Sequence, residues 1–477
     1  MKNLSELLAS HPEILSVTSN SKDVKTDSVF VAITGEKSDG NLFIEAALKS
    51  GARWIISEKK LNVSNSTQVP DARAAFGFLA GELAGNPSDS MWVIGVTGTS
   101  GKTTTTYLLE SILKSAQHKV GIIGTIEIRI DHQKLDSTHT TPGAVELQDV
   151  FRSMKNAGCT AVVMEVSSHA LKQHRAYGVF FDGVIFSNLT PEHLDYHPDL
   201  EDYFQSKKLL FTHQAKRSHA RGKKPVASIH DDHAFGTRLI KELRSDPDSP
   251  FSKIDPFQVG DSVIMDDKGV RGVFTGIKIS SPLVGRFNAE NIASAVSLTH
   301  SLGIKETAIQ IGIKNVTAVP GRLERVLDAD HGRNVLVDYA HKPDALEKVL
   351  LTLRELKKPD QKIITVMGCG GDRDRFKRPK MGKIAAQHSD IFIVTSDNPR
   401  TEDPDQIIAE ITAPLQKGTY VVESDRKKAI ESAIASARAG DWVLIAGKGH
   451  ENYQLIDDQK LPFDDRKVAA NALGYKT

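Results

Sequence analysis

The apolar positions of this chain gather into short continuous runs that alternate with amphipathic segments. The runs at 92–96, 161–166 and 183–186 have no polar face, which predicts strands buried on both sides in a parallel sheet. The segment 104–113 instead carries an apolar stripe at helical spacing and predicts a helix. Buried strands that alternate with helices indicate an α/β fold with helices on both faces of the sheet.

Breaks in this pattern divide the chain into three expected domains. Residues 1–87 hold strand candidates at 28–33 and 54–56, and Gly85-Asn86-Pro87 then interrupts the chain. Residues 88–318 hold the runs named above. Residues 319–477 hold four more strand candidates, at 335–337, 363–367, 391–394 and 442–445. A length of 477 residues also suits several domains, because it exceeds what one core usually serves.

A glycine-rich loop joins the strand at 92–96 to the helix at 104–113. It reads Gly98-Thr99-Ser100-Gly101-Lys102-Thr103, and a strand, a glycine turn, Lys-Thr and a helix in this order are typical of a phosphate-binding loop. Backbone N–H groups would surround the phosphates, Lys102 would reach the terminal ones, and Thr103 would bind Mg²⁺. The general motif has glycine where this chain has Val96, so the match is to a shorter loop. A glycine turn with a surface lysine is the alternative.

Two polar positions follow the next strands. Glu165 lies at the end of the run at 161–166, where a carboxylate beside a phosphate loop would suit a second Mg²⁺ ligand. A solvated glutamate would occupy the same position. His193 lies in the segment 188–197, after the run at 183–186, and could bind metal, donate to a phosphate or simply pack.

A lysine falls within an apolar helix face. The stripe consists of Leu200, Tyr203, Phe204, Leu210 and Phe211. At about 100° per residue, Lys207 falls near the middle of this stripe and Lys208 at its edge. An amine there is costly unless it is paired or chemically altered. Lys207 therefore either snorkels to solvent or reacts as a neutral amine with CO₂, giving a carbamate (N6-carboxylysine) whose oxygens can hold a metal.

Each strand of the third domain is followed by a polar or glycine-rich motif. The segment 338–344 could reach a nucleotide if that domain closes over the site. Arg373 and Arg400 suit carboxylates, while Asp397, Asn398 and Glu451 suit an ammonium. Because the ends of parallel strands meet at one edge, these loops predict a site for an amino acid with more than one charged end. Salt bridges within loops are the alternative for any one of these residues.

Charge and cysteine content narrow the classes of function. The net charge of +1, with 25% charged residues, argues against a nucleic-acid-binding protein. Cys159 and Cys369 are the only cysteines, which predicts no disulfide framework and suits a reducing cytoplasm. The N-terminal residues lack the apolar segment of a signal peptide, and no apolar run of 18 residues predicts a membrane span.

Taken together, the motifs resemble those of the Mur ligases, most closely the MurE type, through all three expected domains. They are G-T-S-G-K-T, M-E-V-S-S-H (164–169), H-L-D-Y-H (193–197), V-D-Y-A-H-K-P-D (337–344), G-C-G-G-D-R-D (368–374), D-N-P-R (397–400) and G-K-G-H-E (447–451). The resemblance implies an N-terminal α/β domain that binds uridine, a central P-loop ATPase domain with a parallel sheet, and a C-terminal Rossmann-like α/β domain that binds the amino acid.

The resemblance also implies roles for individual residues. ATP would be bound by Gly98, Thr99, Ser100, Gly101, Lys102, Thr103, Thr104, Asn291, Arg322 and Asp338. Mg²⁺ would be bound at one site by Thr103 and Glu165, and at a second by His193 and carbamylated Lys207. The UDP-muramoyl dipeptide would be held by Ser21, Glu36, Lys37, Ser38, Thr140, Thr141, Ser167, Gln173 and Arg175. The incoming amino acid would be held by Arg373, Asp397, Asn398, Pro399, Arg400, Gly447 and Glu451.

The activity implied is ATP-dependent amide-bond formation in peptidoglycan precursor synthesis, by a cytoplasmic enzyme expected to be a monomer. The enzyme would add meso-diaminopimelate to UDP-N-acetylmuramoyl-L-alanyl-D-glutamate through an acyl phosphate, with Lys102, His193 and Lys207 as its catalytic residues. Arg400 points to diaminopimelate, because lysine-adding relatives usually lack that arginine. The alternatives are the same ligase using L-lysine, a ligase like folylpolyglutamate synthase, and a protein that binds ATP without turnover.

Overall fold

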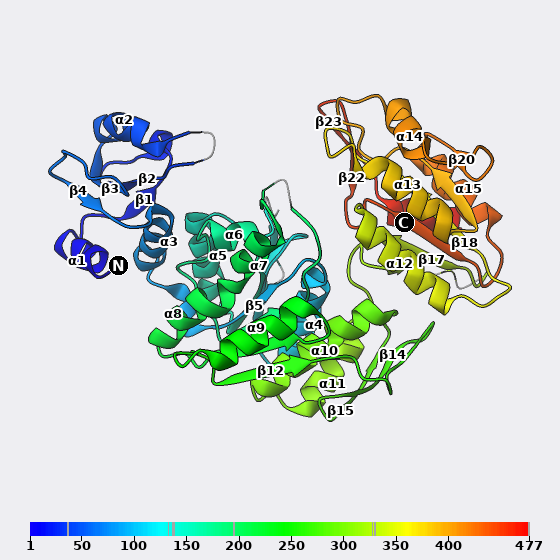
Figure 1. Ribbon diagram of the computed structural model, residues 1–477, viewed down its shortest axis with the longest axis horizontal. Helices are drawn as coiled ribbons and strands as arrows, with labels where there is room; N and C mark the ends of the chain where they lie inside the picture. The colour runs from blue at the N-terminus through cyan, green and yellow to red at the C-terminus, as the bar shows by residue number, and fades with distance from the viewer. Residues whose placement is uncertain are drawn as a thin grey trace. The chain divides into compact units, whose positions relative to one another are not determined.

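The computed structural model describes residues 1–35, 38–131, 133–135, 139–193, 196–326, 328 and 331–475 (Figure 1). The chain forms two compact units. The first comprises residues 1–263, 272–279 and 290–315, and the second comprises residues 264–271, 280–289 and 316–477. The domain boundaries expected near residues 87 and 318 stay predictions. Within the described residues, no helix is both long enough and apolar enough to cross a bilayer.

The N-terminal part of the first unit is a small parallel sheet with helices on both faces (Figure 1). Its strands run in the order β1-β2-β3-β4 and are all parallel. One face packs through Val29, Val31 and Ile56 against α1 and α3, and the other packs through Phe30 and Ile55 against α2. The elements are α1 (Lys2–Ser10), β1 (Ser16–Thr18), η1 (Ser21–Asp23), β2 (Ser28–Ala32), η2 (Gly40–Phe43), α2 (Ile44–Lys49), β3 (Ala52–Ser57), β4 (Ser66–Gln68) and α3 (Ala72–Leu83).

The rest of the first unit is built on an eight-stranded sheet with the order β12-β11-β10-β5-β9-β6-β7-β8. The strands from β12 to β6 are parallel, and β7 and β8 add an antiparallel hairpin that the sequence did not predict. The strands are β5 (Trp92–Thr97), β6 (Val120–Ile123), β7 (Ile128–Ile130), β8 (Gln133–Leu135), β9 (Ala161–Glu165), β10 (Gly183–Phe186), β11 (Val226–His230) and β12 (Lys253–Phe257).

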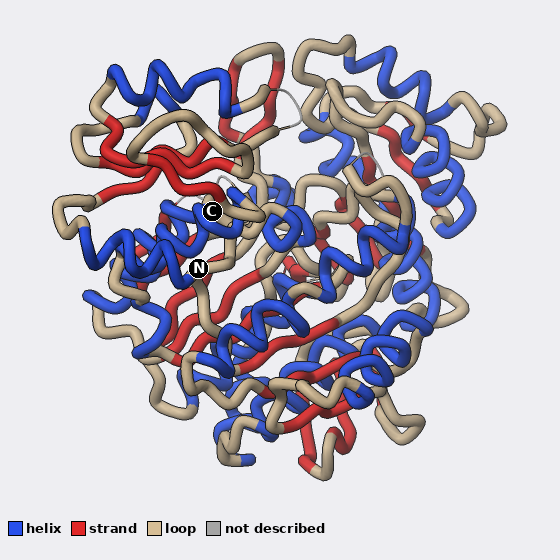
Figure 2. Tube along the Cα trace, turned by 60° about the vertical axis from the view of Figure 1, so that its left-hand side comes forward, coloured by secondary structure: helices blue, strands red, loops and turns tan. Residues whose placement is uncertain are grey.

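Helices flank this sheet, and Figure 2 shows its strands as a layer between them. Phe151, Phe204 and Leu239 belong to a core cluster that joins α5, α7 and α9 to one face. The helices of the unit are η3 (Pro87–Ser90), α4 (Lys102–Ser115), α5 (Ala144–Asn156), α6 (Ser168–Lys172), α7 (Leu200–Lys208), the π-helix η4 (Leu210–Gln214), α8 (Ala215–Ala220), α9 (Ala234–Ser245), α10 (Arg286–Ser301), whose first residues belong to the second unit, and α11 (Glu306–Asn315).

The second unit is built on a six-stranded sheet with the order β16-β17-β21-β18-β19-β20, parallel except for β16. Core clusters place α12, α13 and α14 on one face and α15 and α16 on the other. Its elements are β16 (Glu324–Val326), β17 (Asn334–Asp338), α12 (Pro343–Leu356), β18 (Ile363–Met367), α13 (Lys377–His388), β19 (Ile391–Val394), α14 (Pro404–Thr412), β20 (Val421–Val422), α15 (Arg426–Ser436), β21 (Trp442–Ala446), β22 (Tyr453–Ile456), β23 (Gln459–Pro462) and α16 (Asp465–Ala472). Three further strands lie where the chain passes between the units: β13 (Ile264–Asp266), β14 (Gly269–Phe274) and β15 (Ile277–Ser281).

Candidate active site

The loop between β5 and α4 is shaped by two glycines. Gly98 and Gly101 have φ values of 149° and 87°, which side-chain-bearing residues rarely adopt. A Cβ atom at Gly101 would lie 2.3 Å from Oδ1 of Asn291, a buried residue of α10. The Lys102 amine donates to the carbonyl oxygens of Gly98 (2.8 Å) and Thr99 (3.0 Å). The expected strand–loop–helix arrangement is therefore confirmed, with Lys102 folded over the loop.

Glu165 is buried and joins this loop to the neighbouring strand β9. Its side chain accepts hydrogen bonds from Thr103 Oγ1 (2.9 Å) and from the N–H (3.1 Å) and Oγ1 (2.9 Å) of Thr125. Because the residue is only 1% exposed, the interpretation as a solvated strand-end glutamate is wrong. The described contacts of this carboxylate are all with neutral donors, and a hard oxygen group in such surroundings suits a small divalent cation.

Lys207 is fully buried, so the alternative of a snorkelling side chain is wrong. It is 1% exposed, its Nζ donates to the Gly98 carbonyl oxygen (2.9 Å), and Nζ lies 4.4 Å from the centroid of the Tyr203 ring. Burial first, and then the charge of Lys102, lower the pKa of Lys207 well below its ordinary value. Lys208 points elsewhere, with Nζ 2.6 Å from Glu242 Oε2. The structure thus places against the glycine-rich loop an amine whose neutral form is favoured by its surroundings.

The helix after Lys207 is not regular. Residues Leu210–Gln214 form a π-helical turn, in which the Gln214 N–H donates to the Leu209 carbonyl oxygen (3.0 Å). A π turn changes which side chains share a face, and such turns are frequent at functional sites. Leu210 and Phe211 are nevertheless fully buried, as the apolar stripe predicted.

His193 lies beside the same aromatic ring that Lys207 contacts. The centroids of the His193 and Tyr203 rings are 6.2 Å apart, and the His193 backbone has a φ of 57°. Its Nε2 is 3.2 Å from Glu192 Oε1. Within the part of the chain that the structure describes, no group of three His, Cys, Asp or Glu side chains forms a metal site. A metal held here would therefore need other oxygen donors, such as the hydroxyl of Thr103 or a carbamate on Lys207.

Five of the residues expected to hold the UDP-muramoyl dipeptide (Thr140, Thr141, Ser167, Gln173 and Arg175) form one network beside Glu165, the Thr141 network. Thr141 Oγ1 donates to the Glu165 carbonyl oxygen (2.9 Å) and accepts from the Ser167 N–H (3.1 Å). Arg175 donates to the Thr141 carbonyl oxygen (3.0 Å) and, through Nε and Nη2, to Gln173 Oε1 (2.9 and 2.7 Å). Thr140 joins the same network, since its hydroxyl lies 3.0 Å from that of Thr125, which contacts Glu165.

Ser21 and Ser38, which are also expected to hold the UDP-muramoyl dipeptide, at its uridine end, lie in the N-terminal sheet region. Ser21 begins the short helix η1, and Ser38 is exposed, with its carbonyl oxygen accepting from the Gly35 N–H (2.9 Å). Glu36 and Lys37 lie outside the described residues. No described hydrogen bond joins Ser21 or Ser38 to the Thr141 network, so these assignments stay predictions.

In the second unit, the ends of four adjacent strands bring the remaining motifs to one edge. Asp338 ends β17 and is buried, and its Oδ2 accepts from the Leu323 N–H (2.7 Å). Burial raises the pKa of Asp338, although the neighbouring Arg322 opposes this shift. Arg322 lies over the Tyr339 ring, 4.9 Å from its centroid. The Gly447 N–H at the end of β21 donates to the Asp338 carbonyl oxygen (3.0 Å), which joins the two strand ends.

Asn398 is held by the G-K-G-H-E loop. Its Oδ1 accepts from Lys448 Nζ (2.9 Å) and the Leu455 N–H (2.9 Å), and its Nδ2 donates to Glu451 Oε2 (2.8 Å). Lys448 is fully buried and lies 3.2 Å from Glu451 Oε2. Asn398 and Glu451 are thus brought together as expected, with Lys448 as a buried cation between them.

Charges of both signs surround Tyr453. Its pKa is raised by burial and by Glu451, whereas the guanidinium groups of Arg400 and Arg373 act in the opposite direction. A Cβ atom at Gly370 would lie 2.9 Å from Arg400 Nη1 and 3.9 Å from Arg373 Cγ, so the two arginines proposed from the sequence for an amino acid with several charged ends are neighbours. Glu451 contacts Asn398, in the same loop as Arg400. The amino acid site would also contain Tyr453, which sequence reasoning missed.

Sequence reasoning also missed other residues that contact the candidate site residues. Lys448 stood inside a recognised motif, but its burial could not be deduced from a glycine-rich loop. Thr125 contacts Glu165, which lies 40 residues further along the chain, and the local sequence carries no signal for such a contact. Tyr203 lies one helical turn before Lys207 on α7 and belongs to the predicted apolar stripe, but its contact with the amine was not predicted. Cys369, in the loop after β18, is buried with its Sγ 3.8 Å from Met381 Sδ, and burial raises the pKa of its thiol to about 12.

Comparison with known families gives matches along most of the chain. The family described as "Mur ligase family, catalytic domain" matches residues 13–82, "Mur ligase middle domain" matches 96–299, and "Mur ligase, glutamate ligase domain" matches 321–449.

Individual relatives match over nearly the full length. A UDP-N-acetylmuramoyl-L-alanyl-D-glutamate–2,6-diaminopimelate ligase of Geobacter metallireducens is 43% identical over 485 residues, covering 96% of this chain and 94% of the relative. The ligase of the same name from Syntrophomonas wolfei is 41% identical, covering 100% and 98%. A solved structure of a protein with this name is 34% identical, with a TM-score of 0.71 over 97% of this chain and 95% of that chain. E. coli FolC in complex with ADP is 21% identical, with a TM-score of 0.58 over 79% of this chain and 90% of that chain, a likeness of fold alone.

Proposed function

The chain belongs to the Mur ligase family, and on that premise we propose that it joins meso-diaminopimelate to the D-glutamate of UDP-N-acetylmuramoyl-L-alanyl-D-glutamate in peptidoglycan precursor synthesis. Membership in the family implies the use of ATP. We propose further that residues 1–87 bind the UDP substrate, residues 88–318 bind ATP and residues 319–477 bind the amino acid.

The observation that carries this proposal is the continuous hydrogen-bonded path from the glycine-rich loop to the Thr141 network. Thr103 contacts the Glu165 carboxylate, and Thr141 contacts both the Glu165 carbonyl oxygen and Ser167. A phosphate held at the loop and a carboxylate held by Thr141 and Arg175 would therefore lie side by side. This is what an ATP-dependent activation of a carboxylate requires.

The chemistry follows in two steps. An oxygen of the D-glutamate γ-carboxylate attacks the γ-phosphorus of ATP, the bond to the bridging oxygen of ADP breaks, and an acyl phosphate forms. The amine of diaminopimelate then attacks the acyl carbon, phosphate leaves, and the nitrogen loses a proton to give the amide. Lys102 stabilises the charge that develops on the transferred phosphoryl group, so catalysis consists mainly of positioning and electrostatic stabilisation.

The oxygen-rich groups at this edge of the central sheet fit Mg²⁺. We propose that Thr103 and Glu165 hold one ion, and that His193 and a carbamate on Lys207 hold another. When bound, Mg²⁺ would neutralise negative charge on the phosphate oxygens. The residues of the chain do the rest: Thr125 orients Glu165, and Tyr203 packs against Lys207.

The test of the function is release of ADP in the presence of ATP, the UDP-muramoyl dipeptide and one amino acid at a time. We expect release that depends on meso-diaminopimelate, with much weaker release on L-lysine. Turnover with lysine alone would establish the lysine-adding alternative. Turnover only with a folate and glutamate would establish the folylpolyglutamate alternative, and absence of any substrate-stimulated hydrolysis would favour an ATP-binding protein without catalysis.

Arg400→Lys is expected to lower kcat/KM for diaminopimelate by about 10- to 100-fold, because a lysine cannot hold a carboxylate bidentately and such charged hydrogen bonds are worth about 1.5–3 kcal/mol. The KM for ATP and kcat/KM for L-lysine are expected to stay within about twofold of the wild-type values, since lysine lacks the second carboxylate. Steady-state kinetics with both amino acids measure this. An equal loss with both amino acids would contradict the proposed contact.

Gly101→Ala is expected to weaken ATP binding by at least about tenfold, because the new Cβ atom meets Asn291 Oδ1 and the loop must shift. The positive φ adds about 1–2 kcal/mol of backbone strain. Gly222→Ala is the matched control: Gly222 has a φ of 88°, and nothing lies within 4 Å of the position that its new methyl group would take. Calorimetric titration with ATP compares the two variants, and equal affinities would mean that the Asn291 contact is unimportant.

A further inference from the structure

The second unit contains a buried cation that the proposed chemistry does not use. Arg378, in the first turn of α13, has a fully buried side chain. Its Nη1 and Nη2 each lie 2.8 Å from a different oxygen of Glu402, so the pair is bidentate. Nη1 also lies 2.8 Å from Glu410 Oε2, and Nη2 donates to the Gly370 carbonyl oxygen (3.2 Å). These acceptors and the burial exclude Arg378 as a residue that touches a substrate.

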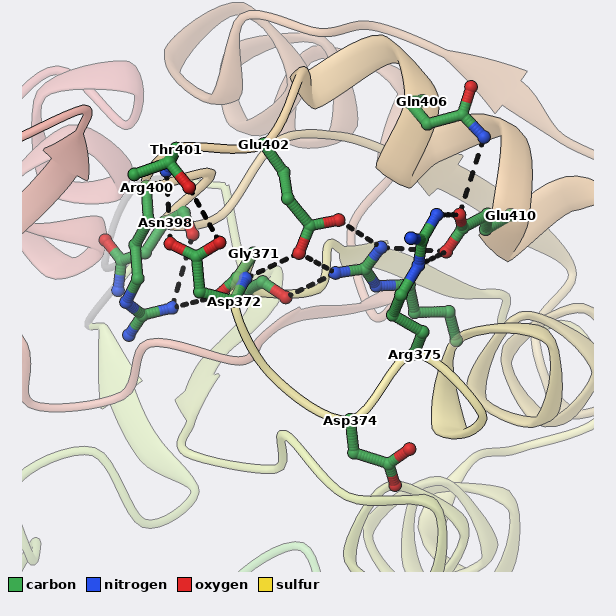
Figure 3. A network of polar contacts seen from close by, with 12 residues as sticks. Gly371, Asp372, Asp374, Arg375, Asn398, Arg400, Thr401, Glu402, Gln406 and Glu410 are labelled. Atoms are coloured by element: carbon green, nitrogen blue, oxygen red, sulfur yellow. Dashed lines mark hydrogen bonds and ion pairs between the residues drawn. The ribbon is translucent and has the colours of Figure 1, made fainter.

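Glu402 links Arg378 to the two loops of the proposed amino acid site, which follow β18 and β19. One of its oxygens also accepts from the Asp372 N–H (2.5 Å). The Asp372 carboxylate in turn accepts from the N–H (3.2 Å) and the hydroxyl (2.8 Å) of Thr401. Figure 3 shows Glu402 between the Gly371–Asp372 segment and Glu410, with Arg400 and Thr401 beside Asp372. The loop after β18 is therefore joined to the D-N-P-R loop after β19 at several points.

Both loops are held in conformations that need external support. Arg400 and Asp372 have φ values of 54° and 51°, in the left-handed region that costs a residue other than glycine about 1–2 kcal/mol. Gly371 packs so closely that a Cβ atom there would lie 1.9 Å from the Pro399 carbonyl oxygen. The bidentate pair of buried Arg378 and partly buried Glu402 supplies a rigid support at this point, because it fixes both distance and orientation.

The Arg400 side chain is aimed by the same contacts. Its Nη1 donates to the carbonyl oxygen of Gly371 (2.7 Å), and Gly371 is the residue before Asp372. The contacts described for this guanidinium use Nη1 only, which leaves the edge formed by Nε and Nη2 to meet a carboxylate in a bidentate manner. A shift of the loop by about 1 Å would misalign that edge, and such shifts can cost about 100-fold in rate.

We propose that Arg378 is a positioning residue for amino acid specificity, which acts through Glu402 and Asp372 to hold Arg400 in the orientation that recognises the second carboxylate of the incoming amino acid. This inference rests on the function proposed above. It assigns the discrimination between an amino acid with two carboxylates and one with a single carboxylate to a buried group outside the D-N-P-R motif. The Arg378 hydrogen bonds also hold the pKa of Glu402 at about 2, so the support persists at neutral pH.

The test compares Arg378→Lys with the wild-type chain. Lysine keeps the charge but not the planar fork, so we expect the KM for diaminopimelate to rise by about 10- to 100-fold. We expect kcat at saturating diaminopimelate, and the KM values for ATP and the UDP substrate, to stay within about twofold. The ratio of kcat/KM for diaminopimelate to that for L-lysine is expected to fall by the same factor as the KM rises. A purely structural role would lower the active fraction, and hence kcat, with every substrate alike.

Two further variants guard against a simple failure to fold. Glu402→Gln keeps the shape and an acceptor for the Asp372 N–H but removes the charge pair, so it should give the same selective rise in KM. The double variant with Arg378→Lys should be no worse than the more affected single variant, since both break one connection. Arg375→Lys is the matched control: Arg375 contacts the same Glu410 but is 58% exposed, and we expect changes within about twofold.

The outcomes separate this inference from the function on which it rests. A wild-type chain that releases no ADP with diaminopimelate overturns the proposed function and this inference with it. Normal wild-type turnover, together with an unchanged KM for diaminopimelate in both Arg378→Lys and Glu402→Gln, overturns this inference alone. A loss of kcat with an unchanged KM also overturns it, because that pattern is the mark of a merely structural contact.

Discussion

Lys207→Ala and Lys207→Met are both expected to lower substrate-dependent ADP release by about 100- to 1,000-fold, the usual cost of removing one group that stabilises developing charge. The reason lies in the surroundings of the amine. Burial and the charge of Lys102 lower the pKa of Lys207, so the amine is neutral at a lower pH than an exposed lysine. A neutral amine adds to the carbon of CO₂ and releases one proton, which leaves the carbamate anion that the second Mg²⁺ is proposed to need.

The methionine variant matters because it keeps most of the buried volume, so its loss of activity cannot be ascribed to a cavity. Lys208→Met is the matched control, since the neighbouring side chain points to Glu242 instead of the glycine-rich loop. Labelling with ¹³C-bicarbonate should give a carbamate carbon signal in the wild-type spectrum that disappears in Lys207→Met. Near-normal turnover of Lys207→Met at ambient CO₂ would refute the proposed role in metal binding.

The second large effect concerns stability. Arg426→Met is expected to destabilise the second unit by about 3–5 kcal/mol, because it leaves the Asp465 carboxylate buried without its partner. Both side chains are 0% exposed, with Nε 2.8 Å from Asp465 Oδ1 and Nη2 2.7 Å from Oδ2. Arg426 also donates to the carbonyl oxygens of Ser396 (3.3 Å) and Ala446 (3.1 Å), which follow β19 and end β21. Its loss is therefore expected to loosen the strand ends that carry the proposed amino acid site.

Hydrogen exchange of the β19 and β21 amides measures this effect in the unit concerned, which is preferable to a global melting curve for a protein of two units. The double variant Arg426→Met with Asp465→Leu should be more stable than Arg426→Met, since no uncompensated charge remains. Arg152→Met is the comparison for an exposed pair: Arg152 and Asp149 are about half exposed, and a loss below about 1 kcal/mol is expected. Similar losses for the buried and the exposed pair would contradict this account.

Much of the fold could be predicted because buried parallel strands are continuous apolar runs. The runs at 183–186, 363–367 and 391–394 coincide with β10, β18 and β19 to the residue. The hairpin of β7 and β8 was missed, because its strands are three residues long and the second is wholly exposed. Short exposed strands are stabilised by pairing with neighbours and carry little pattern of their own.

The candidate site divides in a similar way. Lys207 was found because an amine inside an apolar stripe contradicts the local pattern. Its burial rules out the snorkelling alternative, and the carbamate stays a prediction. Arg378 and Lys448 could not be found in this way, since each stands in a segment of polar and glycine residues where a solvated charge is normal. They are buried by loops that come together only in the folded protein, and no local periodicity in the sequence indicates these contacts.

The burial of Cys369 has a practical consequence. The thiol follows β18 in the loop that Arg378 supports, it packs against Met381, and its pKa of about 12 keeps it protonated at neutral pH. The reactive form of cysteine is the thiolate. Alkylating reagents and peroxide would therefore react with Cys369 only slowly while the loop keeps its thiol buried. Any event that opens this loop would expose Cys369 to such reagents. The rate of alkylation of Cys369 would then report the rate at which the loop opens, and no label would have to be introduced.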